Sequence, residues 1–383
     1  MKKVCVVTAT RAEYGLLRGV IQEIISDDYL ELCLVVTGTH LSEKYGLTIK
    51  EIQQDEFPIA ESIDILSEED SCIGICKTMS IAMEKFGEMY ERQMPDMLVV
   101  LGDRYELIPI CSSAMVFGIP IAHISGGELT EGAIDDAVRH SITKMSYLHF
   151  PACEEYRRRI IQLGEHPSRV FNFGDVGVEN IRKMELLSKE ELEHDLGMEL
   201  SQYASVTFHP VTLETNTAKK QVEELLKVIV SHPEIQFIVT LSNADLHGEM
   251  INRIFEEAER NCSNIKCFAS LGIKRYLSLL RYAQFVLGNS SSGIIEAPCF
   301  GIPTINIGDR QKGRIKAESI IDCEPIAESI ERSIEIALSK DFIEKARNAK
   351  CLLGDGDTSH SIVDKIREIL YGHIDLKKKF YDI

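Results

Sequence analysis

Acidic side chains that could move protons follow apolar, strand-like runs in the first half of the chain. Asp103 comes directly after the run 96–101, Glu128 follows the next such run, and Asp135 and Asp136 lie a few residues further on. Because the carboxyl ends of parallel strands share one edge of a sheet, these carboxylates are expected to converge there. Carboxylates in different environments can remove one proton and return another. Alternatively, Asp103 caps the next helix and the others are surface charges of an acidic chain.

A second set of residues suits an anion such as a diphosphate. The segment 288–303 combines a strand end, a turn of small hydroxyl residues and a helix. Ser290 and Ser291 offer hydroxyl and backbone N–H groups at the start of that helix, where the helix dipole favours a phosphate. Glu296 lies about one helical turn further on and could reach a ribose hydroxyl. The alternative is an ordinary capped helix.

Basic and polar residues follow other strand-like runs. Arg11 follows the first run, Arg104 follows Asp103, and His209 and Asn243 end two runs of the second half. Such positions place side chains at the ligand-binding edge of a parallel sheet, although a surface ion pair and a structural histidine are the alternatives for Arg11 and His209.

The segment 308–314 contains three cationic side chains, which is dense for a chain of net charge −18. Arg310 and Arg314 in this segment would suit a diphosphate, and the alternative is a solvated basic loop.

Strands alternate with helices along the whole chain, which predicts two α/β domains. The expected strands are 3–10, 31–37, 96–101, 119–123, 147–150, 169–173, 205–209, 236–241, 265–268, 285–287 and 303–307. The expected helices include 16–26, 73–94, 154–163, 179–197, 219–231, 245–261 and 274–281. We therefore predict two doubly wound, Rossmann-like domains facing a central cleft: an N-terminal domain, residues 1–173, and a C-terminal domain, residues 174–360. Residues 361–383 are expected to pack back on the N-terminal domain as a helix and tail.

Composition limits the possible functions. The chain has 383 residues, 44% of them hydrophobic, which is enough for two cores. Its negative charge argues against a general nucleic-acid binder, and it lacks an apolar run of about 18 residues that could span a membrane. The 11 Cys residues are scattered, and the close pairs 72/76 and 262/267 lack zinc-site spacing, so we expect reduced thiols, a cytoplasmic protein and no metal.

These motifs together resemble the hydrolysing UDP-N-acetylglucosamine 2-epimerase family of sialic-acid and legionaminic-acid pathways, whose fold is like that of the B-type glycosyltransferases. The resemblance covers nearly the whole chain. It is carried by the segments 10–14 (TRAEY), 36–40 (VTGTH), 100–104 (VLGDR), 123–128 (HISGGE), 134–144, 208–210 (FHP), 288–293 (GNSSSG) and 307–314 (IGDRQKGR).

The resemblance implies roles for single residues. Arg11, Ser290 and Ser291 would hold the nucleotide, Glu296 would bind the ribose and the backbone near Leu271 the base. Asp103 and His209 would lie at the sugar, with Asp135 or Asp136 beside it. It also implies a nucleotide-sugar substrate, no cofactor and a homo-oligomer, either a dimer or a tetramer.

One position departs from the family pattern. Non-hydrolysing relatives, and some hydrolysing ones, have a Glu where this chain has Ser125, so its proton-transfer role is expected to fall to Glu128 or to Asp135 and Asp136. The expected reaction converts UDP-N-acetylglucosamine and water to N-acetylmannosamine and UDP. The alternatives are the same reaction on UDP- or GDP-N,N′-diacetylbacillosamine and a glycosyltransferase of the same fold.

Overall fold

The chain folds into two compact units. The computed structural model describes residues 1–131, 133–211, 217–242, 248–354 and 356–383. The first unit comprises residues 1–128, 134–182 and 353–383, and the second comprises 129–133 and 183–352. The domain boundaries expected from the sequence, after residues 173 and 360, both fall inside the first unit.

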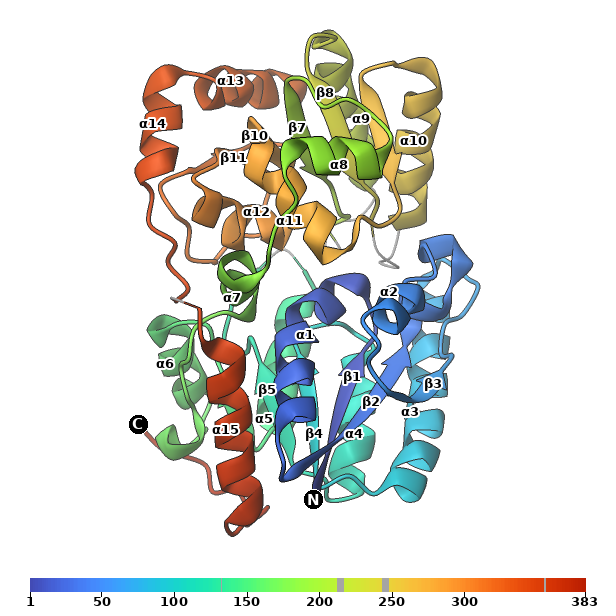
Figure 1. Cartoon of the computed structure of the whole chain (residues 1–383), viewed down its shortest axis with the longest axis vertical. Helices are drawn as coiled ribbons and strands as arrows, with labels where there is room; N and C mark the ends of the chain where they lie inside the picture. The colour runs from blue at the N-terminus through green and yellow to red at the C-terminus, as the bar shows by residue number, and fades with distance from the viewer. Residues whose placement is uncertain (132, 212–216, 243–247, 355) are drawn as a thin grey trace. The chain divides into compact units, whose positions relative to one another are not determined.

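The first unit is built on a six-stranded parallel sheet (Figure 1). Its strand order, β3-β2-β1-β4-β5-β6, is that of a Rossmann domain. The strands are β1 (Lys2–Thr8), β2 (Leu30–Thr37), β3 (Ile59–Ile63), β4 (Met97–Leu101), β5 (Ile121–Ile124) and β6 (Leu148–Phe150). The helices are α1 (Arg11–Ser26), α2 (Ile49–Gln54), α3 (Cys72–Gln93), α4 (Leu107–Val116), α5 (Asp135–Met145), α6 (Glu154–Gln162), α7 (Val176–Lys183) and α15 (Thr358–Tyr371).

Alternate residues of β1 enter two different cores, because successive side chains of a strand point to opposite faces of the sheet. Val4 and Val6 join the core formed with α1 and α15. Cys5 and Val7 join the core formed with α3 and α4. Helices therefore cover both faces, and the strands are apolar on both sides as in other buried parallel sheets.

The second unit repeats this architecture. Its parallel sheet has the order β12-β11-β10-β7-β8-β9, which is the same Rossmann order counted from its own first strand. The strands are β7 (Tyr203–Thr207), β8 (Gln236–Thr240), β9 (Ile265–Phe268), β10 (Phe285–Gly288), β11 (Thr304–Ile307) and β12 (Ile320–Cys323). The helices are α8 (Lys189–Leu196), α9 (Ala218–Ser231), α10 (Gly248–Asn261), α11 (Gly272–Tyr282), α12 (Ser291–Ile295), α13 (Ala327–Ala337) and α14 (Lys340–Asn348).

The predicted fold class, two doubly wound α/β domains, is confirmed, but three local predictions were wrong. Residues 169–173 form a single bridge, between Val170 and His149, in place of a strand. The edge strands β3 and β12 were not predicted. Residues 11–15, expected as a loop, are the first turn of α1, because Thr10 caps the helix at that point.

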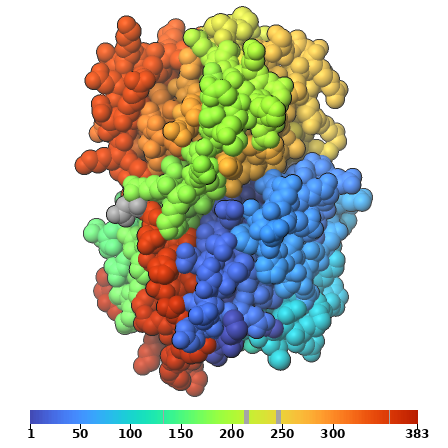
Figure 2. All heavy atoms as spheres, viewed as in Figure 1, coloured from blue at the N-terminus to red at the C-terminus, as the bar shows by residue number. Residues whose placement is uncertain are grey.

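The C-terminal segment belongs to the first unit, where α15 packs against α1 (Figures 1 and 2). The Tyr371 hydroxyl donates to the Tyr29 carbonyl at 3.0 Å. Further on, Lys378 reaches the buried Glu165 carboxylate at 3.0 Å. Within the part of the chain that the structure describes, every helix is too short or too polar to cross a bilayer.

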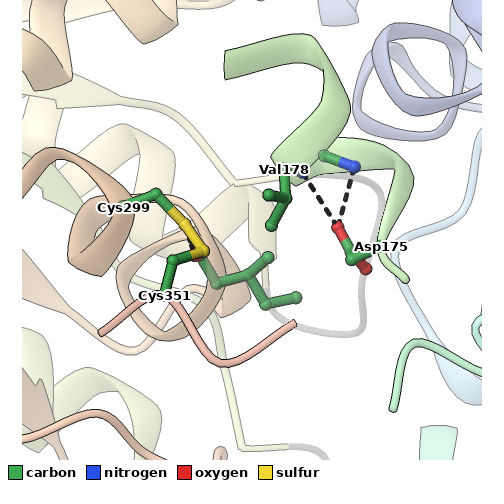
Figure 3. Close-up of a disulfide and its surroundings, with 6 residues drawn as sticks. Asp175, Val178, Cys299 and Cys351 are labelled. Atoms are coloured by element: carbon green, nitrogen blue, oxygen red, sulfur yellow. Dashed lines mark hydrogen bonds between the residues drawn. A yellow bond between two sulfur atoms is a disulfide. The ribbon is translucent and has the colours of Figure 1, made fainter. Parts of the chain in front are cut away.

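Cys299 and Cys351 form a disulfide within the second unit (Figure 3). Cys299 lies in a short helical turn after α12, and Cys351 lies in the segment after α14. The expectation that all thiols are reduced does not hold for this pair. The two cysteines are 52 residues apart in the sequence, so no local spacing indicates that they meet. The remaining nine cysteines are free thiols.

Candidate functional site

Arg139 on α5 joins two of the predicted acidic residues. Its guanidinium donates to the Asp103 carboxylate, and its Nη1 donates to the backbone carbonyl of Glu128 at 3.1 Å. Arg139 is only 1% exposed, while the side chain of Asp103 keeps 22% of its surface exposed. One buried cation therefore fixes the loop after β4 and the loop after β5, and it leaves part of the Asp103 carboxylate open to solvent.

His123 on β5 forms a hydrogen bond with the loop after β4. Its Nε2 lies 2.7 Å from the Gly102 carbonyl, and its Nδ1 lies 3.3 Å from the Thr143 hydroxyl. Burial lowers the pKa of His123 to about 3, so the ring is neutral. Because a carbonyl can only accept, Nε2 carries the proton and Nδ1 accepts from Thr143. Gly102, the residue before Asp103, therefore accepts a hydrogen bond from a histidine ring that Thr143 orients and that stays neutral near neutral pH.

Asp135 and Asp136 begin α5, where acidic side chains complement the helix dipole. Asp136 pairs with His140 one turn along the helix, with 3.6 Å between the carboxylate oxygen and Nε2. Burial lowers the pKa of His140, and Asp136 partly opposes this effect. Both aspartates remain half-buried at the same edge of the sheet as Asp103.

Ser125, in the turn after β5, adopts a strained backbone. Its φ of +60° lies in the left-handed region, which costs a residue with a side chain about 1–2 kcal/mol. The Ser125 N–H donates to the Phe150 carbonyl at 3.0 Å, so the turn joins β5 to β6. Strained residues often lie at functional turns.

Arg11 is the first residue of α1 and is half-buried. The helix begins with a capping box, in which Thr10 accepts from the Glu13 N–H and Glu13 accepts from the Thr10 N–H. Arg104 donates to the buried Glu106 carboxylate at 3.1 Å. The expected substrate roles of Arg11 and Arg104 remain predictions.

Asn289 organises the corresponding edge of the second unit. It is fully buried directly after β10, and its side chain exchanges two hydrogen bonds with the His209 backbone, at 2.7 and 2.8 Å. The Asn289 carbonyl accepts from Gln311 at 2.9 Å and from Arg310 at 3.2 Å. His209 Nδ1 lies 2.9 Å from the Ser242 hydroxyl. Asn289 therefore connects the strand end that carries His209 to the basic loop.

The turn after β10 needs its glycine. Gly288 has a φ of +136°, and a Cβ there would lie 2.0 Å from the Thr207 carbonyl oxygen. Ser290 caps α12, and Ser291 is the first residue of the helix. The helix ends at Ile295, and Glu296 follows as its C-terminal cap, with its N–H donating to the Ser292 carbonyl one turn earlier. Glu296 is buried, at 8% exposure.

The basic loop, residues 308–314, contacts Leu129 and Glu131, which belong to the second unit. The Glu131 N–H donates to the Lys312 carbonyl at 3.2 Å. Gly313 lies against Leu129, where an added Cβ would come within 2.7 Å. Arg310 and Arg314 are both half-buried on this loop. Leu129 and Glu131 come from the first half of the sequence, but their contacts with the basic loop place them in the second unit.

Two further predicted binding residues are Leu271 and Asn243, and the structure describes only the first. Leu271 caps α11 and is buried, and its carbonyl accepts from Arg275 at 2.7 Å. Asn243 lies outside the described residues. Among the residues that are described, no three His, Cys, Asp or Glu side chains gather as a metal site would require.

Three residues that hold the loops at the carboxyl ends of the strands were not predicted from the sequence. They are Arg139, Asn289 and Gln311. Asn289 could have been found, because it is a polar residue directly after an apolar strand, like Asp103. Arg139 and Gln311 carried no such signal, since their contacts come from helix and loop packing.

Comparison with known proteins identifies the family. The sequence profile of the UDP-N-acetylglucosamine 2-epimerase family matches residues 22–367. The chain belongs to this family. The family resemblance predicted from the motifs is thereby confirmed, and the chain is a nucleotide-sugar 2-epimerase.

Individual relatives of this epimerase refine the picture. It is 45% identical over 343 residues to the GDP/UDP-N,N′-diacetylbacillosamine 2-epimerase (hydrolyzing) of Campylobacter jejuni, covering 89% of this chain and 88% of that protein. It is 39% identical over 386 residues to the polysialic acid biosynthesis protein P7 of Escherichia coli, covering 100% and 98%. The structure of the Neisseria meningitidis UDP-GlcNAc 2-epimerase bound to UDP-GlcNAc has the same fold, with a TM-score of 0.80, 18% identity and coverage of 96% and 100%.

Proposed function

We propose that this epimerase is hydrolysing: it converts a nucleotide-linked 2-acetamido sugar and water to the free 2-epimer and a nucleoside diphosphate. The sequence favoured UDP-N-acetylglucosamine, with diacetylbacillosamine as the alternative. The observation that carries the substrate choice is the 45% identity to the Campylobacter jejuni enzyme, so we propose UDP- or GDP-N,N′-diacetylbacillosamine as the preferred donor. UDP-N-acetylglucosamine is the second candidate, which the name of a relative that is 29% identical over 387 residues, the UDP-N-acetylglucosamine 2-epimerase of Neisseria meningitidis, supports.

The proposed reaction has two steps. A base takes the C2 proton, the bond from C1 to the diphosphate oxygen breaks, and the nucleotide leaves with the electron pair. Water then adds its hydroxyl to C1 of the unsaturated sugar, and a proton returns to the opposite face of C2. Both steps need a positioned acid or base, and the first needs stabilisation of the leaving diphosphate.

We assign the proton transfers to the acidic edge of the first unit. Asp103 is rigidly held by Arg139 and keeps a partly exposed carboxylate, which suits contact with the sugar. Glu128 and the pair Asp135 and Asp136 are the candidates for the second proton transfer, because the Ser125 hydroxyl does not readily lose or gain a proton near neutral pH. A dimer or tetramer remains our expectation for the assembly.

We assign the nucleotide to the Asn289-centred edge and to Arg11. Ser290 and Ser291 would contact the diphosphate, Arg310 and Arg314 would offset its charge, and Glu296 would bind the ribose. This role requires a fixed basic loop, which the hydrogen bonds from Arg310 and Gln311 to the Asn289 carbonyl provide. His209, held by the same Asn289 side chain, would lie at the sugar.

The test compares donors directly. The pure protein is incubated with UDP- and GDP-diacetylbacillosamine and with UDP-N-acetylglucosamine, and nucleotide release is followed without added acceptor and in EDTA. We expect release from diacetylbacillosamine donors at the highest kcat/KM, unaffected by chelation. Release that requires a sugar acceptor would instead identify a glycosyltransferase, and faster turnover of UDP-N-acetylglucosamine would select the second candidate.

A further inference from the structure

Residues 372–383, which we call the tail, follow α15 and belong to the first unit. The Tyr381 N–H donates to the Gly164 carbonyl at 2.9 Å. The Phe380 ring packs so closely on Gly164 that a Cβ at this position would clash with it. These contacts fix the course of the tail two and three residues after Lys378.

The Lys378 ammonium is bound at the C-terminal end of α5. It donates to the carbonyls of Lys144 and Ser146 at 2.8 and 2.6 Å, and to the Glu165 carboxylate at 3.0 Å. The last carbonyls of a helix have no partner within the helix, and the helix dipole favours a cation beside them. Because an ammonium has three donors, Lys378 serves as a cap for α5 and as a partner of Glu165 at the same time.

Glu165 joins the same end of α5 to β6 and to the tail. Its side chain is 1% exposed, its Oε1 accepts from the Lys144 ammonium at 2.6 Å, and its Oε2 lies 3.2 Å from His149 Nε2. Burial alone would raise the pKa of Glu165, but hydrogen bonds from His149 and Lys144 lower it to about 2, so the carboxylate is charged. One buried anion therefore holds both Lys144 of α5 and Lys378 of the tail.

The opposite end of α5 carries residues of the candidate site. Asp136, His140 and Lys144 are spaced four residues apart and therefore follow one face of the helix, with Asp136 3.6 Å from His140. Arg139 on the same helix donates to the Asp103 carboxylate. A helix of 11 residues is about 16 Å long, and its continuous hydrogen bonds make it move as one body. A shift of α5 at its capped end would therefore also displace Asp136 and Arg139.

We propose that Lys378 is a positioning residue for the epimerase reaction: by capping α5 it fixes Asp136 and Arg139, and through Arg139 it fixes the Asp103 carboxylate. Reacting groups that are misplaced by about 1 Å can lose a factor of about a hundred in rate, so the position of α5 matters for turnover. The effect on turnover rests on the proposed function. The effect on α5 does not, and it is measured in protein without substrate.

The first experiment is amide hydrogen exchange, followed by mass spectrometry, of the wild type and Lys378→Met. Methionine removes the three donors, while Lys144 and Arg169, the latter at 3.9 Å, still face the Glu165 charge. We expect exchange to be about tenfold faster across α5 and in residues 125–128, whose backbone Arg139 holds. Faster exchange confined to the tail and to residues 163–169 would show that the tail only docks, and would overturn the proposal.

The matched control is Lys379→Met, which removes the same charge from the next residue. Lys379 is exposed, and we expect its variant to exchange and to turn over substrate as the wild type does. Equal effects of the two substitutions would mean that the charge of the tail matters and not the cap on α5, which contradicts the proposal.

The second experiment separates positioning from stability. Lys378→Met should lower kcat by about tenfold or more, with KM for the donor and Kd for UDP changed by about twofold at most, because the nucleotide is assigned to other elements. Arg367→Ala is the control for stability: Arg367 pairs with Asp364 at 2.7 Å and with Asp27, so its loss should lower Tm and leave kcat unchanged. Wild-type kcat in Lys378→Met, or a kcat that falls with Tm equally in both variants, would overturn the proposal.

Phe380→Ala keeps the test decisive if Lys378→Met does not fold. The Phe380 side chain is 64% exposed, so its removal leaves the core intact. It removes the packing on Gly164 and the contact with the Lys144 ammonium, which lies 5.1 Å from the ring centre. We expect the same changes in α5 exchange and in kcat, of about threefold, and wild-type values of both would overturn the proposal.

Failure of the proposed function is recognised separately. If the wild type turns over no donor, the assigned reaction is wrong, while the exchange of α5 and of residues 125–128 still decides whether Lys378 positions this helix.

Discussion

Arg139 donates to the Asp103 carboxylate from a position that is almost fully buried, and through the same guanidinium it holds the backbone of Glu128. Asp103 is therefore both a candidate catalytic residue and a charge partner of a buried cation. A substitution at Asp103 therefore has two separable consequences, one for turnover and one for folding.

Asp103→Asn should lower kcat by about a hundredfold or more while nucleotide binding persists, because the carboxylate is placed with the sugar and not with the diphosphate. It should also lower Tm, since it removes a negative charge that accepts a hydrogen bond from the buried Arg139 guanidinium. Steady-state kinetics, calorimetry with UDP and a thermal melt measure the three effects.

The matched control for this variant is Asp96→Asn at the other end of β4. Asp96 pairs with Lys2 at 2.8 Å and accepts from the Lys3 N–H at 2.8 Å, so this change also removes an ion pair. We expect a lower Tm with kcat unchanged. If Asp103→Asn abolishes UDP binding, or if Asp96→Asn loses turnover equally, Asp103 has a structural role only.

The double variant Arg11→Ala and Ser290→Ala should weaken nucleotide binding, because each change removes a proposed phosphate partner. Hydrogen bonds to charged groups are worth about 1.5–3 kcal/mol each, which corresponds to at least tenfold in Kd per residue. Arg18→Ala is the control: Arg18 lies on the same helix but pairs with Asp55 at 2.9 Å, so its loss should leave UDP affinity as it was. Equal weakening by the control would remove Arg11 from the site.

The sequence correctly predicted which candidate site residues follow the ends of central strands. The runs before Asp103 and His209 are apolar and buried on both faces, so their strands and strand ends are marked by composition alone. The turn at 288–293 could be predicted for the same reason, because a Gly and cap residues follow an apolar run.

Edges and side-chain bridges could not be predicted. β3 and β12 are short edge strands with polar residues, so they lack the continuous apolar signal of the central strands. The segment 169–173 has that signal, but Phe171 and Phe173 pack against Phe150, with ring centroids 6.3 and 6.0 Å apart, without forming a ladder. Arg139 and Asp103 are 36 residues apart in the sequence, and their contact depends on how α5 packs. A short sequence pattern therefore cannot predict it.

The disulfide predicts a thiol count. The sequence has 11 cysteines, and with Cys299 and Cys351 joined, nine should react with a thiol reagent after denaturation without reductant. All 11 should react after reduction. Cys299→Ser should leave ten thiols reactive in both conditions, because Cys351 is then released. Eleven reactive thiols in unreduced wild-type protein, purified without reductant, would show that the pair is not oxidised in solution.

The order of bond breaking predicts where solvent hydrogen enters the product. If a carboxylate removes the C2 proton before the nucleotide leaves, and a second group returns a proton to the opposite face, the released sugar must carry one solvent-derived hydrogen at C2. Simple glycoside hydrolysis would keep the original C2 hydrogen and the original C2 configuration. The reaction is therefore run in deuterium oxide and the product is examined by proton NMR.

We expect the 2-epimer of the donor sugar, deuterated at C2 in every turnover. Asp136→Asn or Glu128→Gln, by slowing the second proton transfer, should release part of the sugar as the unsaturated 2-acetamidoglucal intermediate, which the wild type retains until water adds. Leakage from one variant and not from the other would identify which acid serves in place of the Glu absent at Ser125. A product with protium at C2 and unchanged configuration would refute the elimination, and Asp103 and its neighbours would then be hydrolytic residues on a shared fold.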